Sequence, residues 1–181
     1  MATFAKCLAA ACFSISVVPA VAQAADGRDQ FFATLKSMCG QKFAGVMTYP
    51  LDPKHDFAGK RLAAHVASCT DNEVRVPFQV GEDRSRTWVF TKGKGDLALR
   101  HDHRHADGTP DAVTMYGGLA TTTGSGSAQS FKADEYTAKL VNGAVTNVWT
   151  VSINSDGSEL TYHLERDAKP RFTGVLKRLA P

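Results

Sequence analysis

The chain has 181 residues, a formal net charge of +3 and 43% hydrophobic residues. This length suits one domain with a sizeable core. The weak charge and the lack of a Lys/Arg-rich stripe argue against nucleic-acid binding. No stretch after residue 24 is long and apolar enough to predict an integral membrane segment.

The first 24 residues have the pattern of a secretory signal peptide. Lys6 precedes the apolar run CLAAACFSISVVPAVA, which ends at a small-residue cleavage site over residues 22–24. We therefore expect a signal peptide over residues 1–24 and one domain over residues 25–181, which the strand pattern described below predicts to be a β-barrel. The mature chain is then periplasmic or extracellular.

The chain contains four cysteines, of which cleavage removes Cys7 and Cys12. Cys39 and Cys69 remain, and an isolated cysteine pair in an exported protein predicts a disulfide. A metal pair or a nucleophile is the weaker alternative, because the spacing is not C-x-x-C.

One short helix is predicted over residues 28–39. Its apolar residues recur at helical spacing, Asp29 can cap the start, and Gly40 can end it. The apolar face consists of Phe31, Phe32, Leu35 and Met38.

After residue 41 the hydrophobic period changes to two, which predicts strands. They are expected over residues 42–49, 61–69, 73–80, 86–90, 96–105, 111–118, 135–140, 147–153, 159–166 and 171–179. Turn residues at 81–83, 92–95, 142–143 and 156–157 separate several of them. Residues 121–130, TTTGSGSAQS, hold no large apolar residue and are expected to form a mobile loop.

The strands follow one another without room for helical crossovers, so the sheet is antiparallel and mostly a meander. An open sheet would leave its apolar face wet and its edges unpaired. We therefore predict a mainly β fold, an antiparallel meander of about nine or ten strands closed into a barrel with one short N-terminal helix. A two-sheet sandwich is the alternative.

The stretch LRHDHRHADG over residues 99–108 concentrates three histidines at two-residue spacing. Alternation puts His101, His103 and His105 on the same face as two preceding leucines, and Arg100 on the opposite face. The leucines place the histidine face in the core, near one barrel end.

Three interpretations of these histidines remain open. His101 and His103 stand at a spacing that lets both reach one zinc or copper ion, with His65, His163 or Glu73 as a third ligand. Alternatively, the cluster lines a barrel mouth and holds a polar or anionic ligand, which Arg100 could reach through a bulge. In the third interpretation the histidines are a solvated hairpin tip, and the Arg and Asp residues form ion pairs.

The helix followed by a meander resembles the calycin-type barrels, the lipocalins and fatty-acid-binding proteins. The resemblance covers Phe31 to Leu179 and implies an interior ligand site. The chain departs from lipocalins because its first strand, FAGVMTY, has no G-x-W, and because it ends in a strand. The stretches LRHDHRHADGTPDAVTMYGG and NVWTVSI also resemble small exported bacterial proteins to which no reaction is assigned.

The sequence favours a binder of a small, partly apolar molecule over an enzyme. The alternative is a metal-binding protein or metal-dependent enzyme that uses His101 and His103. Neither the ligand nor the oligomeric state can be read from the residues. The binding residues are predicted to be His101, His103 and Arg100 at the mouth, and, within the lining, Phe43, Met47, Val76, Phe78, Trp88, Phe90, Trp149 and Tyr162.

Overall fold

A computed structural model describes residues 26–180 together with Met1. Apart from Met1, the predicted signal peptide lies outside the described residues. The strands are β1 (Lys42–Tyr49), β2 (Leu62–His65), β3 (Ser68–Cys69), β4 (Glu73–Val80), β5 (Asp83–Lys92), β6 (Leu97–His103), β7 (Tyr116–Gly124), β8 (Ala128–Ala133), β9 (Val148–Ile153), β10 (Glu159–Arg166) and β11 (Lys169–Arg178). The helices are α1 (Gly27–Ser37), α2 (Glu135–Leu140) and the short η1 (Ala144–Thr146).

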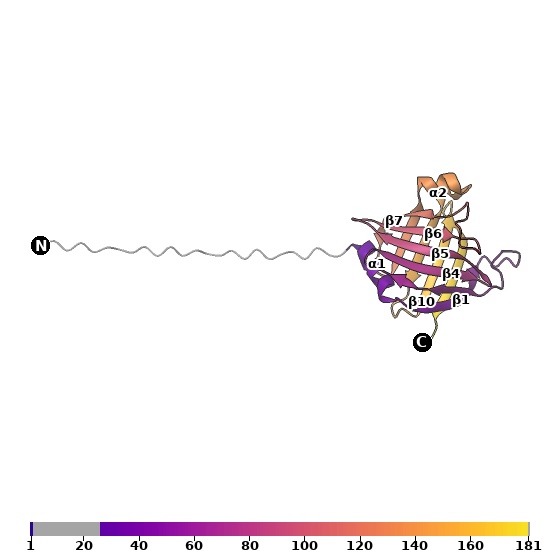
Figure 1. The fold of residues 1–181 in the computed structure, drawn as a ribbon, viewed down its shortest axis with the longest axis horizontal. Helices are drawn as coiled ribbons and strands as arrows, with labels where there is room; N and C mark the ends of the chain where they lie inside the picture. The colour runs from indigo at the N-terminus through magenta and orange to yellow at the C-terminus, as the bar shows by residue number, and fades with distance from the viewer. Residues whose placement is uncertain (2–25, 181) are drawn as a thin grey trace.

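The strands form one antiparallel sheet that closes on itself, which confirms the predicted barrel (Figure 1). Most neighbours in the sheet are consecutive in sequence, as a meander requires. Closure comes from β2, which pairs with β1 on one side and β4 on the other, while β11 pairs with β1. Ten strands make the barrel, and the two-residue β3 extends it beside β4.

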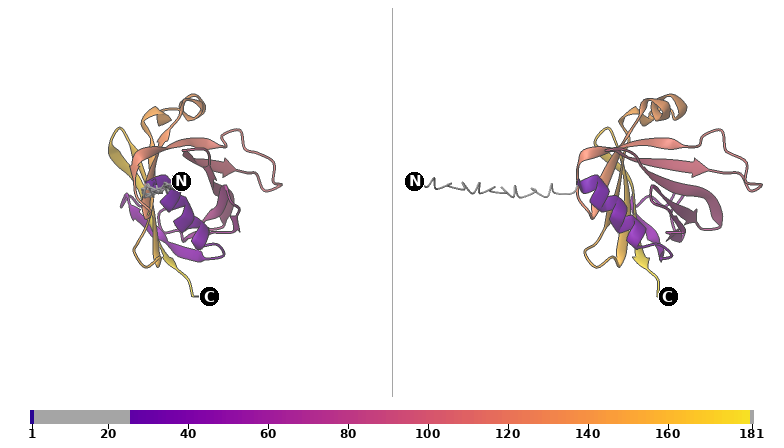
Figure 2. Two further views of the ribbon diagram at one scale, coloured as in Figure 1. Left: turned by 90° about the vertical axis from the view of Figure 1, so that its left-hand side faces the viewer. Right: turned by 60° about the vertical axis from the view of Figure 1, so that its left-hand side comes forward.

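Helix α1 closes one end of the barrel and lies across its opening (Figure 2, left). Asp26 caps the helix by accepting from the backbone N–H of Arg28 at 2.9 Å, so the helix starts before the predicted cap Asp29. Its apolar face is buried at Phe31, Phe32 and Leu35. The helix contacts β5, β6, β7 and β8, and it therefore forms part of the core.

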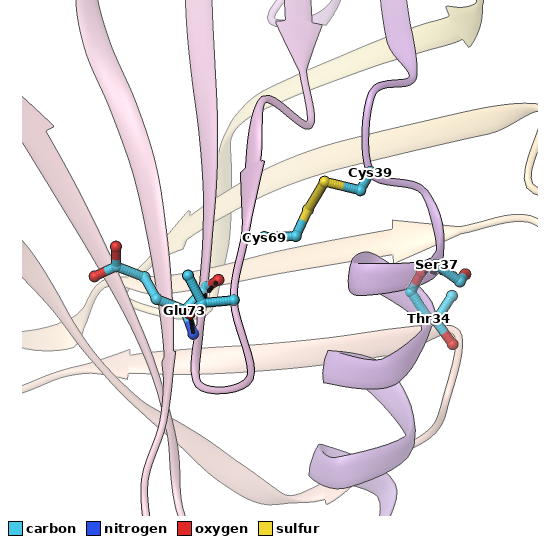
Figure 3. The surroundings of a disulfide bond; sticks show 6 residues. Thr34, Ser37, Cys39, Cys69 and Glu73 are labelled. Atoms are coloured by element: carbon cyan, nitrogen blue, oxygen red, sulfur yellow. Dashed lines mark hydrogen bonds between the residues drawn. A yellow bond between two sulfur atoms is a disulfide. The ribbon is translucent and has the colours of Figure 1, made fainter.

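The predicted disulfide is present between Cys39 and Cys69, and it joins the segment after α1 to β3 (Figure 3). The two cysteines are 30 residues apart. Closing a loop of this length in the unfolded chain stabilises the fold by about 3–4 kcal/mol in the chain-entropy model. The bond therefore fastens the closing helix to the barrel wall.

Residues 135–140 form helix α2, and the prediction of a strand there was wrong. The side chain of Asp134 caps the helix by accepting from the N–H of Thr137 at 2.9 Å, and Lys139 pairs with Glu135 one turn away at 2.7 Å. These local helix signals outweigh the short alternation that suggested a strand. The Thr137 hydroxyl also donates to the carbonyl and accepts from the N–H of Gly117, which holds the helix against β7.

The prediction of a loop over residues 121–130 was also wrong for most of the segment. Strand β7 runs to Gly124, and β8 begins at Ala128, so most of the segment lies within strands. Gln129 is buried, and the hydroxyls of Ser130 and Thr150 lie 2.8 Å apart across neighbouring strands. Hydrogen bonds such as that between Ser130 and Thr150 thus join small polar residues across neighbouring strands of this wall.

Several other boundaries also differ from the prediction. The strand expected over residues 61–69 is divided into β2 and β3, and β7 begins at Tyr116 instead of residue 111. Gly143 has a φ of 73° and starts η1 instead of turning a hairpin. Within the described residues no helix combines the length and the hydropathy needed to cross a bilayer.

Candidate ligand-binding cavity

The barrel contains a cavity of about 690 Å³ at the end opposite α1. Strand β5 runs from the cavity to the helix. Arg86 lines the cavity, and Phe90, four residues further along the strand, packs against Phe31 of α1 with ring centroids 6.2 Å apart. This volume falls in the range of small-molecule sites. The lining residues are Tyr49, Pro50, Asp52, His55, Asp56, Phe57, Phe78, Arg86, Trp88, His101, His103, Tyr116, Val141, Asn147, Trp149, Tyr162, Leu164, Arg166, Pro170, Arg171 and Phe172.

Strand register arranges one wall of the cavity in two rows. The deeper row places Trp88 of β5, His101 of β6 and Tyr116 of β7 side by side as pairing partners. The outer row places Arg86 opposite His103. Two residues along a strand span about 7 Å, so the outer row lies that much nearer the mouth.

His101 lies at the centre of a hydrogen-bond network in the deeper row. Its Nδ1 lies 3.1 Å from the carbonyl oxygen of Tyr116, and its Nε2 lies 2.6 Å from the hydroxyl of Tyr162. A carbonyl can only accept, so Nδ1 carries the proton and Nε2 accepts the proton of Tyr162. Because its proton is used in this bond, the hydroxyl of Tyr162 can only accept a hydrogen bond from a ligand.

Burial keeps this network uncharged. Desolvation lowers the pKa of His101 to about 3 from its ordinary 6.5. Burial also raises the pKa of Tyr162 well above its ordinary value and raises that of Tyr116. The floor is therefore neutral near pH 7.

Aromatic rings continue around the floor and one side of the cavity. Phe78 stacks on Trp88 with ring centroids 4.5 Å apart, and His101 stacks on Tyr116 at 4.7 Å. Trp149 lies 5.1 Å from His101 across the interior. Such a surface offers ring faces and edges, which favour contact with another flat ring.

The predicted cavity residues fall into two groups. Those that line the cavity are Phe78, Trp88, His101, His103, Trp149 and Tyr162. Phe90 lies in the core beneath α1, and Phe43, Met47 and Val76 are not among the lining residues. Arg100 lies on the outer wall, where it pairs with Asp134 at 2.6 Å.

The interpretation of the histidines as a solvated tip holds only for His105. His101 is 4% exposed, and His103 is half-buried with its Nε2 3.1 Å from the hydroxyl of Tyr116. The ion pairs of that interpretation are present on the outer wall, where Asp102 accepts from Arg104 at 2.8 Å.

A metal at His101 would have to displace the hydrogen bond from Tyr162, since both ring nitrogens of His101 are already used. Among residues 26–180 no group of three or more His, Cys, Asp or Glu side chains is placed to hold an ion. The candidate third ligand His163 lies 2.7 Å from the Thr173 hydroxyl, and it is not a lining residue.

Arg86 and Tyr116 are two of the lining residues that were not predicted from the sequence. Arg86 has the same parity as Trp88 and Phe90 in RTWVF, so alternation alone could have placed it inward. Tyr116 gave a weaker signal, because Met115 has a φ of 57° and breaks the alternation just before the strand begins.

No protein-family model, curated protein or solved structure matches this chain. The barrel is compatible with a calycin-like fold. The function must therefore be inferred from the cavity itself.

Proposed function

We propose that the barrel binds a small, partly apolar molecule in the cavity opposite α1. The observation that carries the proposal is an aromatic cavity of about 690 Å³ whose other end is closed by a packed helix. A barrel built only for stability would fill this space with side chains, because protein interiors are close-packed.

We also propose that the chain acts outside the cytoplasm, after removal of residues 1–24. The disulfide between Cys39 and Cys69 supports this, since such bonds persist in oxidising compartments.

We propose one domain over residues 25–181 and binding without catalysis. The neutral floor supports the latter, because neither His101 nor Tyr162 is poised to exchange a proton near pH 7.

The neutral fluorescent probe N-phenyl-naphthylamine tests this function. We expect its emission to rise on binding to the purified protein. Leu164→Trp places a large ring in the cavity and is expected to weaken binding at least about tenfold, which corresponds to about 1.4 kcal/mol.

Leu119→Trp is the matched control, because Leu119 is 49% exposed and is not a lining residue. This variant should bind the probe as the unmodified protein does. Equal weakening by both variants, or no binding by the unmodified protein, contradicts the proposed function.

A further inference from the structure

The permanent charges of the cavity lie toward its mouth. Aromatic and neutral polar side chains form the floor, as described above. The charged lining residues are Asp52, Asp56, Arg86, Arg166 and Arg171. A ligand that reaches the floor therefore places an apolar part there and any charge nearer the opening.

Arg86 is the charged residue closest to the floor by strand register. It is two residues from Trp88 on β5, and it pairs with Phe78 on one side and His103 on the other. Its guanidinium lies 5.4 Å from the ring centre of Phe57, which restricts its position. One ion pair with Asp83 engages the group, and a guanidinium carries five donors.

Arginines outnumber aspartates among the lining residues. Both aspartates belong to the exposed connection between β1 and β2, whereas Arg86 projects from the barrel wall. The Nε of Arg166 donates to the side-chain oxygen of Asn147 at 2.8 Å, which is a neutral partner. The lining has three arginines and two aspartates, and Asp83, which is not a lining residue, forms an ion pair with Arg86. An anion in the cavity is therefore expected to bind the guanidinium donors of Arg86 that Asp83 does not engage.

We propose that the ligand is a planar ring compound with one anionic group, which inserts its ring against Trp88 and Trp149 and pairs its anion with Arg86. This inference rests on the proposed function, and it adds the charge and the orientation of the ligand. A carboxylate matches a guanidinium in bidentate geometry. The flat faces of the floor match a ring more closely than a flexible chain.

The electrostatics of the neighbouring groups agree with this orientation. Burial is the main cause of the lowered pKa of His103, and the charge of Arg86 lowers it further, whereas the charges of Asp111, Asp83 and Asp102 raise it. The charge of Arg86 also opposes the burial that raises the pKa of Tyr116 and of Tyr162. Arg86 therefore acts on the cavity interior and not only on the solvent outside.

A matched series of ligands separates this inference from the proposed function. Naphthylacetate, naphthylethanol and naphthylethylamine share one ring system and differ in charge, and calorimetry measures their affinities directly. We expect naphthylacetate to bind about tenfold or more tightly than naphthylethanol, since hydrogen bonds to charged groups are the stronger ones. The amine should bind most weakly, and added salt should reduce the difference.

Two substitutions on β5 complete the test. Arg86→Gln should remove the preference for naphthylacetate and keep the affinity for naphthylethanol, which also shows that the variant is folded. Arg84→Gln removes the same charge from an exposed residue on the outer wall, and it should keep the preference. Binding of the alcohol with no preference for the anion, or a preference that survives Arg86→Gln, overturns this inference and leaves the proposed function intact. Failure of all three ligands to bind counts against both.

Discussion

Phe31→Ala is expected to lower the free energy of unfolding by about 3–5 kcal/mol, the typical cost of removing a buried aromatic ring. Phe31 is fully buried at the centre of α1. Its ring lies 6.2 Å from that of Phe90 and 6.3 Å from that of Phe131, so it joins the helix to β5 and β8. Urea denaturation measures the change through the shift of the midpoint.

Ser37→Ala on the exposed side of the same helix is the control, and it should change stability by no more than about 0.5 kcal/mol. The folded Phe31→Ala protein should still bind N-phenyl-naphthylamine, because α1 and the cavity lie at opposite ends. A loss below about 1 kcal/mol for Phe31→Ala would show that the helix does not close the barrel.

The protein should lose about 2–3 kcal/mol of stability between pH 7 and pH 4.5 through His101 alone. The pKa of His101 is about 3 in the folded protein and 6.5 ordinarily, so the unfolded chain binds more protons in this interval. Stability is therefore complete above pH 6.5 and falls as the pH decreases toward 3. His103, whose pKa is also lowered by burial, adds to the loss in the same direction.

Between pH 7 and pH 4.5, Asp26 and Asp83 contribute little to the loss of folding stability. Hydrogen bonds and ion pairs lower the pKa of Asp26 and of Asp83 to about 2, so their stabilisation is lost only as the pH falls below their ordinary value of 3.8. Urea denaturation at several pH values gives the slope of the free energy of unfolding against pH. His101→Gln should flatten it, and His105→Gln on the exposed turn should leave it unchanged. A slope that is the same in all three proteins would contradict a buried neutral His101.

Alternation in the sequence was sufficient to predict the barrel. Strands β1, β4 and β10 have the predicted bounds. In β4 the inward residues are large and apolar, which makes the alternation clear. Alternation does not predict β8, where small polar residues pair within the sheet, or α2, where a capping aspartate starts a short helix. In both places the deciding interactions are hydrogen bonds, which hydrophobic patterning does not record.

The cavity was predictable only in part. The leucines before His101 indicated that its face points inward, and the structure places it there. Its bond to Tyr162 joins residues 61 positions apart, on strands that are not neighbours in the sheet. That contact depends on barrel closure and strand register, which one sequence does not reveal. Phe90 was expected in the lining because alternation shows that its side chain points into the barrel. Alternation does not show that Phe90 lies at the end of the barrel that α1 closes.

The two tryptophans of the chain allow the most direct test of the central claim, which is that a ring-bearing ligand enters this cavity. Trp88 and Trp149 are the only tryptophans in the sequence, and both line the cavity. Their two indole N–H signals can be followed in a ¹H–¹⁵N NMR titration with naphthylacetate. We predict that both signals shift together and give one dissociation constant, equal to that from calorimetry. Binding by calorimetry that leaves both indole signals in place would contradict the account, because the ligand would then occupy another part of the protein.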